Sequence, residues 1–560
     1  MGSRSGNTGD QNFAHEGTGS VPAAWTCAPG VAARAVELWW RALGHPWIAP
    51  TIIIGFCTLL LIIRAITWAN IDLDMAEIYV LPQEWQLTYG LRHPPLLLWL
   101  AKVILDLTGE SVSALYVLKS VILGAGLYAY YRAALEILED KRLAVIALLA
   151  LLSMQSLRST VHLQLVFTVP LISLLALSFL FFMRALKYQR KLDWILLGIC
   201  VALGSWIKYI FMAQAGCVFI GALLVPGLRA RVQAAGAALA AAIAVPFAVV
   251  AYLLPLLADY SLTQLTIAIM RGSGGTSDSS FWISARETLF AGLQSSGVYF
   301  VPGLLLFGLA SWPGARSLDR GAFGRSAAIA TTIAILIGIA SFAIYAIVMK
   351  ATVVYPQWLL PFLMFLPIPV TYWASRTALW RQKAFAALLC ALFVAAPVYR
   401  VYTFERGLQQ CPCDPSYWPL KALAEKIGAH GFHEGTIVAS DYLIAGAMRQ
   451  AHIHSRIIAA GLPPEYFGHH RPLPARYLIV WPTGDFNAWI KPYTERALRL
   501  RNVQRGRVEM PMPGETLASL SYVIVEVPAV VGTDPITGEQ VPSRAASGPA
   551  GQQPATTASP

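Results

Sequence analysis

A chain of 560 residues that is 56% hydrophobic and 13% charged is not an ordinary soluble protein, because soluble domains carry about 25% charged residues. The net charge of +12 fits basic loops on the cytoplasmic side of a membrane, and we favour this interpretation over nucleic-acid binding. Apolar runs of bilayer-crossing length, roughly 17–25 residues, recur along the chain. The composition therefore predicts an all-α polytopic membrane domain.

The chain begins with a polar stretch rich in Gly, Ser and Ala, and we predict that residues 1–45 form a disordered cytoplasmic tail. The membrane domain then covers 46–400. It contains about 11 candidate spans, at 47–68, 111–133, 143–157, 163–183, 192–210, 211–227, 233–257, 297–312, 326–348, 354–374 and 384–399.

Connections rich in Lys and Arg alternate along the chain with connections that are poor in them. The positive-inside rule places the basic connections in the cytoplasm. The N-terminus is then inside and the C-terminus outside, and 69–110 and 258–296 become large outer loops.

The segment 94–108 decides this alternation. A helix of about 15 residues is roughly 22 Å long, which is shorter than the roughly 30 Å hydrocarbon core. We therefore predict an interfacial helix on the outer face. Its apolar side would face lipid through Leu96, Leu97, Leu100, Ile104 and Leu105.

The composition changes near residue 401. Helix-like segments at 416–429 and 442–451 accompany short β-rich runs at 436–439, 457–460, 477–481, 508–510 and 520–527. This pattern predicts a small extracytoplasmic α/β domain over 401–528. The remaining stretch, 529–560, is rich in Pro, Ser, Thr, Gly and Ala, and it predicts a disordered tail.

The first outer loop, residues 69–110, carries the densest group of polar residues beside a predicted span. Asp72 and Asp74 follow the first span directly, with Glu77 close behind. A carboxylate at the outer membrane edge can take the proton of an attacking hydroxyl, orient that hydroxyl or hold a cation. The alternative is a solvated acid that caps the next helix.

Cationic side chains provide the second part of the candidate site. Arg92 and His93 precede Pro94-Pro95, which forces an extended approach and a sharp helix start. Arg158 and His162 lie in a short outer corner, where an anion site or a structural hydrogen bond would explain them.

Lys208 and Tyr209 end the run LLGICVALGSWIKY, at the outer edge of a predicted span. The lysine either extends to the interface as a structural residue or clamps the phosphate of a lipid-linked substrate. Lys350, before YPQWLLPF, allows the same two interpretations.

The run DLDMAEIYVLPQEWQLTYGLRHPPLLLWL resembles the first outer loop of C-type membrane glycosyltransferases. The group it resembles most is the bacterial polyprenyl-phosphate-sugar family related to aminoarabinose transferases and protein O-mannosyltransferases. Further matches are LRSTVHLQL, LGSWIKY, QWLLPFLMFLP and SDYLIAGAMRQ. Members commonly have Asp-Glu where this chain has Asp74-Met75, so Asp72 competes with Asp74 for the role of base.

The resemblance implies an inverting sugar transfer from a polyprenyl-phosphate donor, with Asp74 or Asp72 as catalytic base. The expected acceptor is lipid A, a glycan, a lipid or a protein on the periplasmic face of the bacterial inner membrane. A divalent cation at the acids is an open alternative, although no spacing demands one. The competing interpretations are a transporter or flippase of lipid-linked or small polar substrates, and an envelope scaffold without activity.

Overall fold

The computed structural model describes residues 31–67, 71–89, 94–154, 157, 161, 166–257, 286, 289–290, 321–348, 354–410, 415–460, 475–512, 517–527 and 532–541. Its first part is helical throughout. The helices are α1 (Val31–Ala42), α2 (Ile48–Thr67), α3 (Leu73–Val80), the 3-10 helix η1 (Leu81–Gln83), α4 (Leu96–Thr108), α5 (Val112–Leu138), α6 (Lys141–Ser153), α7 (Thr168–Tyr188), α8 (Lys191–Ser205), α9 (Ile210–Leu224), α10 (Pro226–Arg229), α11 (Ala234–Leu257), α14 (Ala322–Val348), α15 (Pro356–Leu363), α16 (Pro367–Ala374) and α17 (Leu379–Gln410).

Five helices within the described ranges are long and apolar enough to cross a membrane. They are Ile48–Ile66, Val112–Leu138, Thr168–Tyr188, Ala234–Leu254 and Ala322–Val348. The predicted spans over 143–157, 192–210 and 211–227 correspond to shorter helices of 13, 15 and 15 residues. The span predicted at 297–312 lies outside the described residues.

The span predicted at 354–374 is not one continuous helix. It is divided into α15 and α16, each of eight residues, with Pro361 inside the first and Pro367 at the start of the second. A proline has no N–H to donate and clashes with the preceding turn, which explains why one long helix does not form here.

Small residues let the membrane helices approach closely. A Cβ added at Gly126 of α5 would lie 2.6 Å from the Cα of Ser173 on α7. A Cβ at Gly221 of α9 would lie 2.5 Å from the carbonyl oxygen of Ala330 on α14. Neither position has room for a side chain, so these glycines fix the packing of two helix pairs.

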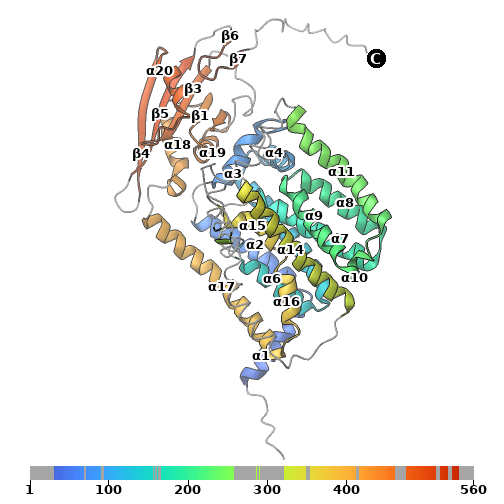
Figure 1. Cartoon of the computed structure of the whole chain (residues 1–560). Coiled ribbons are helices and arrows are strands. Elements are labelled where there is room, and N and C mark those ends of the chain that lie inside the picture. Colours follow the sequence, from blue (N-terminus) through green and yellow to red (C-terminus); the bar gives the residue numbers. More distant parts are fainter. Residues whose placement is uncertain are drawn as a thin grey trace, which may run out of the picture.

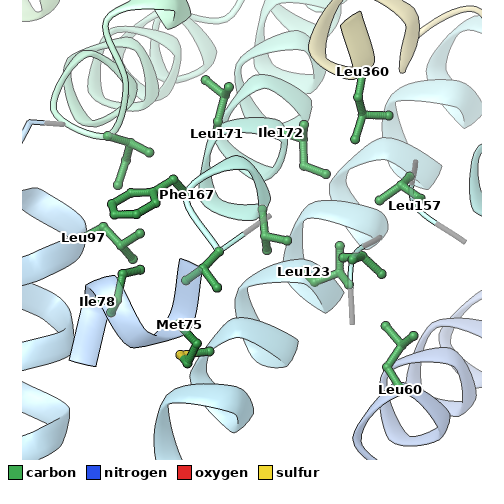
Figure 2. Close-up of a cluster of buried hydrophobic side chains, with 14 of the residues drawn as sticks. Leu60, Met75, Ile78, Leu97, Leu123, Leu157, Phe167, Leu171, Ile172 and Leu360 are labelled. Atoms are coloured by element: carbon green, nitrogen blue, oxygen red, sulfur yellow. The ribbon is translucent and has the colours of Figure 1, made fainter. Parts of the chain in front are cut away.

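The helix α3 is inserted into the core of the helical part. Figure 2 shows its Met75 and Ile78 pointing into a cluster that also contains Leu97 of α4 and Leu123 of α5. The exposed fractions of Met75 and Ile78 are 0% and 2%. This packing holds the eight-residue helix, which is too short to be stable alone.

The predicted helix after Pro94-Pro95 is present as α4, but its predicted lipid-facing side is wrong in part. Leu97 and Leu105 are buried, whereas Val103 and Leu107 are among its exposed side chains. The reason is that α4 packs against α5 and η1, so its most regular apolar stripe faces protein.

The C-terminal α/β unit, described over 415–460, 475–512, 517–527 and 532–541, contains strands at all five predicted β-rich runs. Its elements are η3 (Pro415–Tyr417), α18 (Leu420–Ala429), β1 (Thr436–Ala439), α19 (Tyr442–Ala451), β2 (Arg456–Ala459), β3 (Ala475–Pro482), α20 (Lys491–Leu498), β4 (Val503–Pro511), β5 (Leu517–Val527), β6 (Gly532–Thr533) and β7 (Gln540–Val541).

The five long strands form one sheet in the order β2-β1-β3-β5-β4. The strand β1 pairs parallel with β2 and β3, and β5 pairs antiparallel with β3 and β4. In register, Ile437 lies opposite Ile457 and Leu478. Because β1 and β2 are buried along their whole length, their sequences are continuous apolar runs rather than alternating ones.

The two ends of the helical part differ. In Figure 1, α3, α4 and the C-terminal sheet lie at one end, and the long helix α17 runs from them to the opposite end, where α1 lies. Basic side chains at or near helix ends meet partners at that opposite end, namely Lys383 with Glu37 (2.7 Å), Lys187 with Glu139 (2.9 Å), Arg142 over the Trp40 ring and Arg231 over the Phe323 ring.

Candidate functional site

Asp72 has the best-defined carboxylate of the predicted first outer loop. It is 7% exposed and caps the N-terminus of α3, where Oδ1 accepts a hydrogen bond of 2.9 Å from the Met75 N–H. The Tyr116 hydroxyl on α5 donates to Oδ2 over 2.9 Å. Each carboxylate oxygen of Asp72 therefore accepts a hydrogen bond, one from the backbone of α3 and one from a side chain of α5.

Two buried cations from membrane helices face this acid. Lys119 on α5 and Arg64 on α2 are each 7% exposed, and both act on the charge of Asp72. The Arg64 guanidinium lies over the Tyr116 ring at 4.6 Å from its centroid. Burial raises the pKa of the Asp72 carboxyl above its ordinary value, while Lys119, Arg64 and the Met75 N–H oppose the shift.

Asp74 and Glu77 lie further along α3 and differ in burial. Asp74 is half-buried in the first turn, whereas Glu77 is 6% exposed one turn later. The capping interpretation thus applies to Asp72, which is buried rather than solvated. Asp74 is the more accessible carboxylate of the pair, and Lys119 lies within electrostatic range of both acids.

The corner between α8 and α9 carries Lys208 and Tyr209. Lys208 is half-buried, and Tyr209 is buried against Tyr252, whose hydroxyl donates to the Tyr209 carbonyl over 2.6 Å. The same corner contacts the start of α4, because the Leu96 N–H donates to the Trp206 carbonyl over 3.3 Å. The fold thus joins the Lys208 corner to the first outer loop.

Several predicted site residues lie outside the described residues: Arg92, His93, Arg158, His162 and Lys350. Most of the predicted outer loop 258–296 lies outside them as well.

Our sequence reasoning missed Arg64, Tyr116 and Lys119. A signal for the lysine was available, since a charge inside the apolar run 111–133 is costly and usually functional. Arg64 also lies inside a predicted span. The contribution of Tyr116 depends on a contact between residues 44 positions apart, which no local pattern indicates.

The two aspartates Asp72 and Asp74, here called the acid pair, are a poor fit for a divalent cation. Both oxygens of Asp72 already accept hydrogen bonds, and the nearby positive charges of Lys119 and Arg64 would repel a metal ion. Among the residues that the structure describes, no group of three His, Cys, Asp or Glu side chains is arranged to bind a metal.

Comparison with known proteins gives a consistent class of matches. Residues 92–253 match the family described as dolichyl-phosphate-mannose-protein mannosyltransferase. The lipopolysaccharide core galacturonosyltransferase RgtB of Rhizobium johnstonii is 29% identical over 170 residues, which are 30% of this chain and 34% of that protein. RgtA of the same organism, also a lipopolysaccharide core galacturonosyltransferase, is 23% identical over 444 residues, 77% of this chain and 86% of that protein.

A solved structure, the arabinofuranosyltransferase AftD from mycobacteria, aligns with 89% of this chain and 42% of its own length. The TM-score is 0.44 and the sequence identity 13%. The family match itself begins at Arg92 and ends within α11. It therefore includes Tyr116, Lys119 and Lys208, whereas Asp72 and Asp74 precede it.

Proposed function

We propose that this chain is a membrane glycosyltransferase of the C type, and that it moves a sugar from a polyprenyl-phosphate donor to an acceptor on the periplasmic face. The observation that carries this proposal is the acid pair on α3, held at one end of the membrane helices and opposed by the buried cations Lys119 and Arg64. A transferase that uses a lipid-linked donor needs a base and cations at the membrane surface.

The proposed reaction is an inverting displacement. Asp74 accepts the proton of the acceptor hydroxyl while that oxygen attacks the anomeric carbon. The bond between this carbon and the phosphate oxygen breaks, and the lipid phosphate leaves with the bonding electron pair. We assign the base role to Asp74 because it is the less buried acid, and we assign Asp72 to holding α3.

The departing phosphate requires positive charge. We assign this role first to Lys208, which is half-buried in the corner that contacts α4. Arg92, His93, Arg158, His162 and Lys350 are proposed to bind the donor or the acceptor, together with Glu77 and Tyr209. No step is assigned to a metal ion, because the acid pair fits one poorly.

The distribution of charge supports an active site on the periplasmic side. The helix α1, whose Glu37 pairs with Lys383 and whose Trp40 ring lies under Arg142, is at one end of the molecule in Figure 1, and α3 is at the other. By the positive-inside rule the basic end is cytoplasmic. We therefore propose a multi-pass protein of the bacterial inner membrane whose acids, first outer loop and C-terminal α/β unit face the periplasm.

We propose an envelope saccharide as acceptor. Both relatives are lipopolysaccharide core galacturonosyltransferases by name. A sugar hydroxyl of a lipopolysaccharide would be the first acceptor to test, with another glycan, a lipid or a protein after it. The identity of the sugar, hexosyl or pentosyl, is left to the experiment.

The deciding experiment incubates the purified protein with a polyprenyl phosphate that carries a radiolabelled sugar, together with lipopolysaccharide. Label that moves to the acceptor, joined to it with the anomeric configuration inverted relative to the donor, supports the proposal. A transporter or flippase would instead move intact donor across a vesicle membrane without cleaving it. Movement of intact donor without cleavage would contradict the proposed transferase activity and support a transporter or flippase.

The proposed clamp gives a separate prediction. Lys208→Met removes the cation but keeps the apolar stem of the side chain, so we expect a KM for the donor about tenfold higher. The measurement is transfer rate against donor concentration. The control is Lys102→Met, since Lys102 pairs with Asp106 on α4 at 2.6 Å and has no role in the proposed reaction. An unchanged donor KM in Lys208→Met contradicts the clamp.

The raised pKa of Asp72 predicts a specific pH dependence. Only ionised Asp72 attracts Lys119 and Arg64, so activity is present above its pKa and is lost as pH falls through it. Tyr116→Phe removes a hydrogen bond to the ionised form, which raises the pKa of Asp72 further. The acid limb of the pH–rate profile should therefore move to higher pH.

The control for this shift is Tyr128→Phe, because Tyr128 lies on the same helix but is 44% exposed and contacts Arg132. Its acid limb should match that of the unmodified protein. If Tyr116→Phe leaves the limb in place or moves it to lower pH, Asp72 is not the group that titrates.

A further inference from the structure

The C-terminal α/β unit contacts α3 directly, through a buried arginine. Arg449 on α19 is 4% exposed, and its guanidinium donates to the Tyr79 carbonyl at the end of α3. The same group pairs with the Glu110 carboxylate at 2.6 Å and lies over the Tyr79 ring, 4.7 Å from its centroid. One side chain thus joins α19, α3 and the junction between α4 and α5.

A second contact involves Gln83 of η1, directly after α3. Its amide donates to the Ile457 carbonyl and accepts from the Ile457 N–H, both over 2.8 Å. Ile457 lies on β2, one of the two edge strands of the sheet. The side chain of Gln83 therefore pairs with the free edge as a short piece of additional strand would.

The helices α3 and α19 are also packed closely against each other. A Cβ added at Gly446 of α19 would lie 2.9 Å from the Cβ of Ala76 and 3.0 Å from Cγ2 of Ile71. Gly446 therefore lies beside Ala76, and Arg449 lies beside Tyr79, so α3 and α19 run in the same direction. Ile71 immediately precedes Asp72, which places the acid pair at one end of this helix contact.

We propose that Arg449 and Gln83 are positioning residues, through which the C-terminal α/β unit sets the orientation of the acid-bearing helix α3. The inference rests on the proposed function, since the acids matter only if they act in catalysis. Its physical basis is that an eight-residue helix has little stability of its own, so external contacts fix its direction. A displacement of about 1 Å at a catalytic group can cost about 100-fold in rate.

The experiment compares two buried arginine–glutamate ion pairs in the full-length protein. Glu110→Gln weakens the pair that orients α3. Glu539→Gln weakens the pair between Glu539 and Arg456, which lies within the C-terminal unit. The N–O distance is 2.6 Å in both pairs, and the arginine of each pair is 4% exposed. We expect kcat to fall about tenfold in Glu110→Gln at unchanged donor KM, with kcat unchanged in Glu539→Gln.

A structural role alone would lower the thermal stability of both variants without separating their kcat values. Hydrogen exchange supplies a readout that does not need activity. Amides of 71–83 should exchange faster in Glu110→Gln and in Gln83→Ala, and at the normal rate in Glu539→Gln. The Gln83→Ala variant keeps the test valid if weakening the Arg449 pair prevents folding.

The possible failures are distinguishable. If the unmodified protein transfers no sugar, the proposed function is wrong, and exchange over 71–83 still tests whether these contacts hold α3. If transfer is normal and Glu110→Gln and Gln83→Ala match Glu539→Gln in kcat and in exchange, the positioning role is overturned.

Discussion

We expect that replacing Asp74 by asparagine lowers the rate of sugar transfer by about 10²- to 10⁴-fold while the protein remains folded. The amide keeps the size of the side chain but cannot accept the proton of the attacking hydroxyl. The half-burial of Asp74 in the first turn of α3 leaves it accessible to an acceptor. The measurement is the single-turnover rate with saturating donor and acceptor, because binding then does not contribute.

Two further variants test whether the loss of activity is particular to Asp74. Asp106→Asn changes an acid of the same loop whose partner is Lys102, and it should retain full activity. Asp72→Asn should lose less activity than Asp74→Asn but more thermal stability, because Asp72 caps α3 and holds Tyr116. The reverse order of rates would make Asp72 the base and leave Asp74 to orient the acceptor.

The parts of the fold that the sequence predicted correctly follow from local patterns. The apolar runs at 47–68, 111–133 and 326–348 correspond to α2, α5 and α14 within a few residues. The strand predicted at 436–439 is present with those bounds. Both kinds of segment are marked by composition and length, which do not depend on distant contacts.

The errors come from contacts between elements. The predicted tails were wrong in part, because α1 (Val31–Ala42) lies within 1–45 and the strands β6 and β7 lie within 529–560. Leu97 and Leu105 were predicted to face lipid because α4 is amphipathic, yet its apolar stripe is covered by α5 and η1. The contacts of the C-terminal α/β unit with α3 were not predicted. Arg449 and Tyr79 are 370 positions apart in the chain, and no sequence pattern of a single protein pairs them.

The sequence predicted some features of the candidate site and missed others. The acids were found because charge beside an apolar run is conspicuous, but the difference between a buried Asp72 and a half-buried Asp74 depends on Tyr116 and Lys119. A charge pattern therefore indicates a candidate site, whereas the burial of each carboxylate separates the roles that we propose for the two acids.

Replacing Lys119 by methionine should destabilise the protein by on the order of 3 kcal/mol, because it leaves the buried Asp72 with less compensating charge. Sugar transfer should fall about 100-fold, since displacement of Asp72 moves the turn of α3 that carries Asp74. Thermal unfolding in detergent and single-turnover transfer measure the two effects. Lys102→Met, at a lysine that is 9% exposed and pairs with an accessible acid, is the matched control.

The double variant Lys119→Met with Asp72→Asn separates charge from packing. Removing both charges should recover most of the lost stability, because neither unpaired ion is then buried. Activity should remain low, because the neutral pair no longer holds α3 through a charged carboxylate. If the double variant is no more stable than Lys119→Met alone, the lysine contributes through packing, and its electrostatic role at the acid pair is wrong.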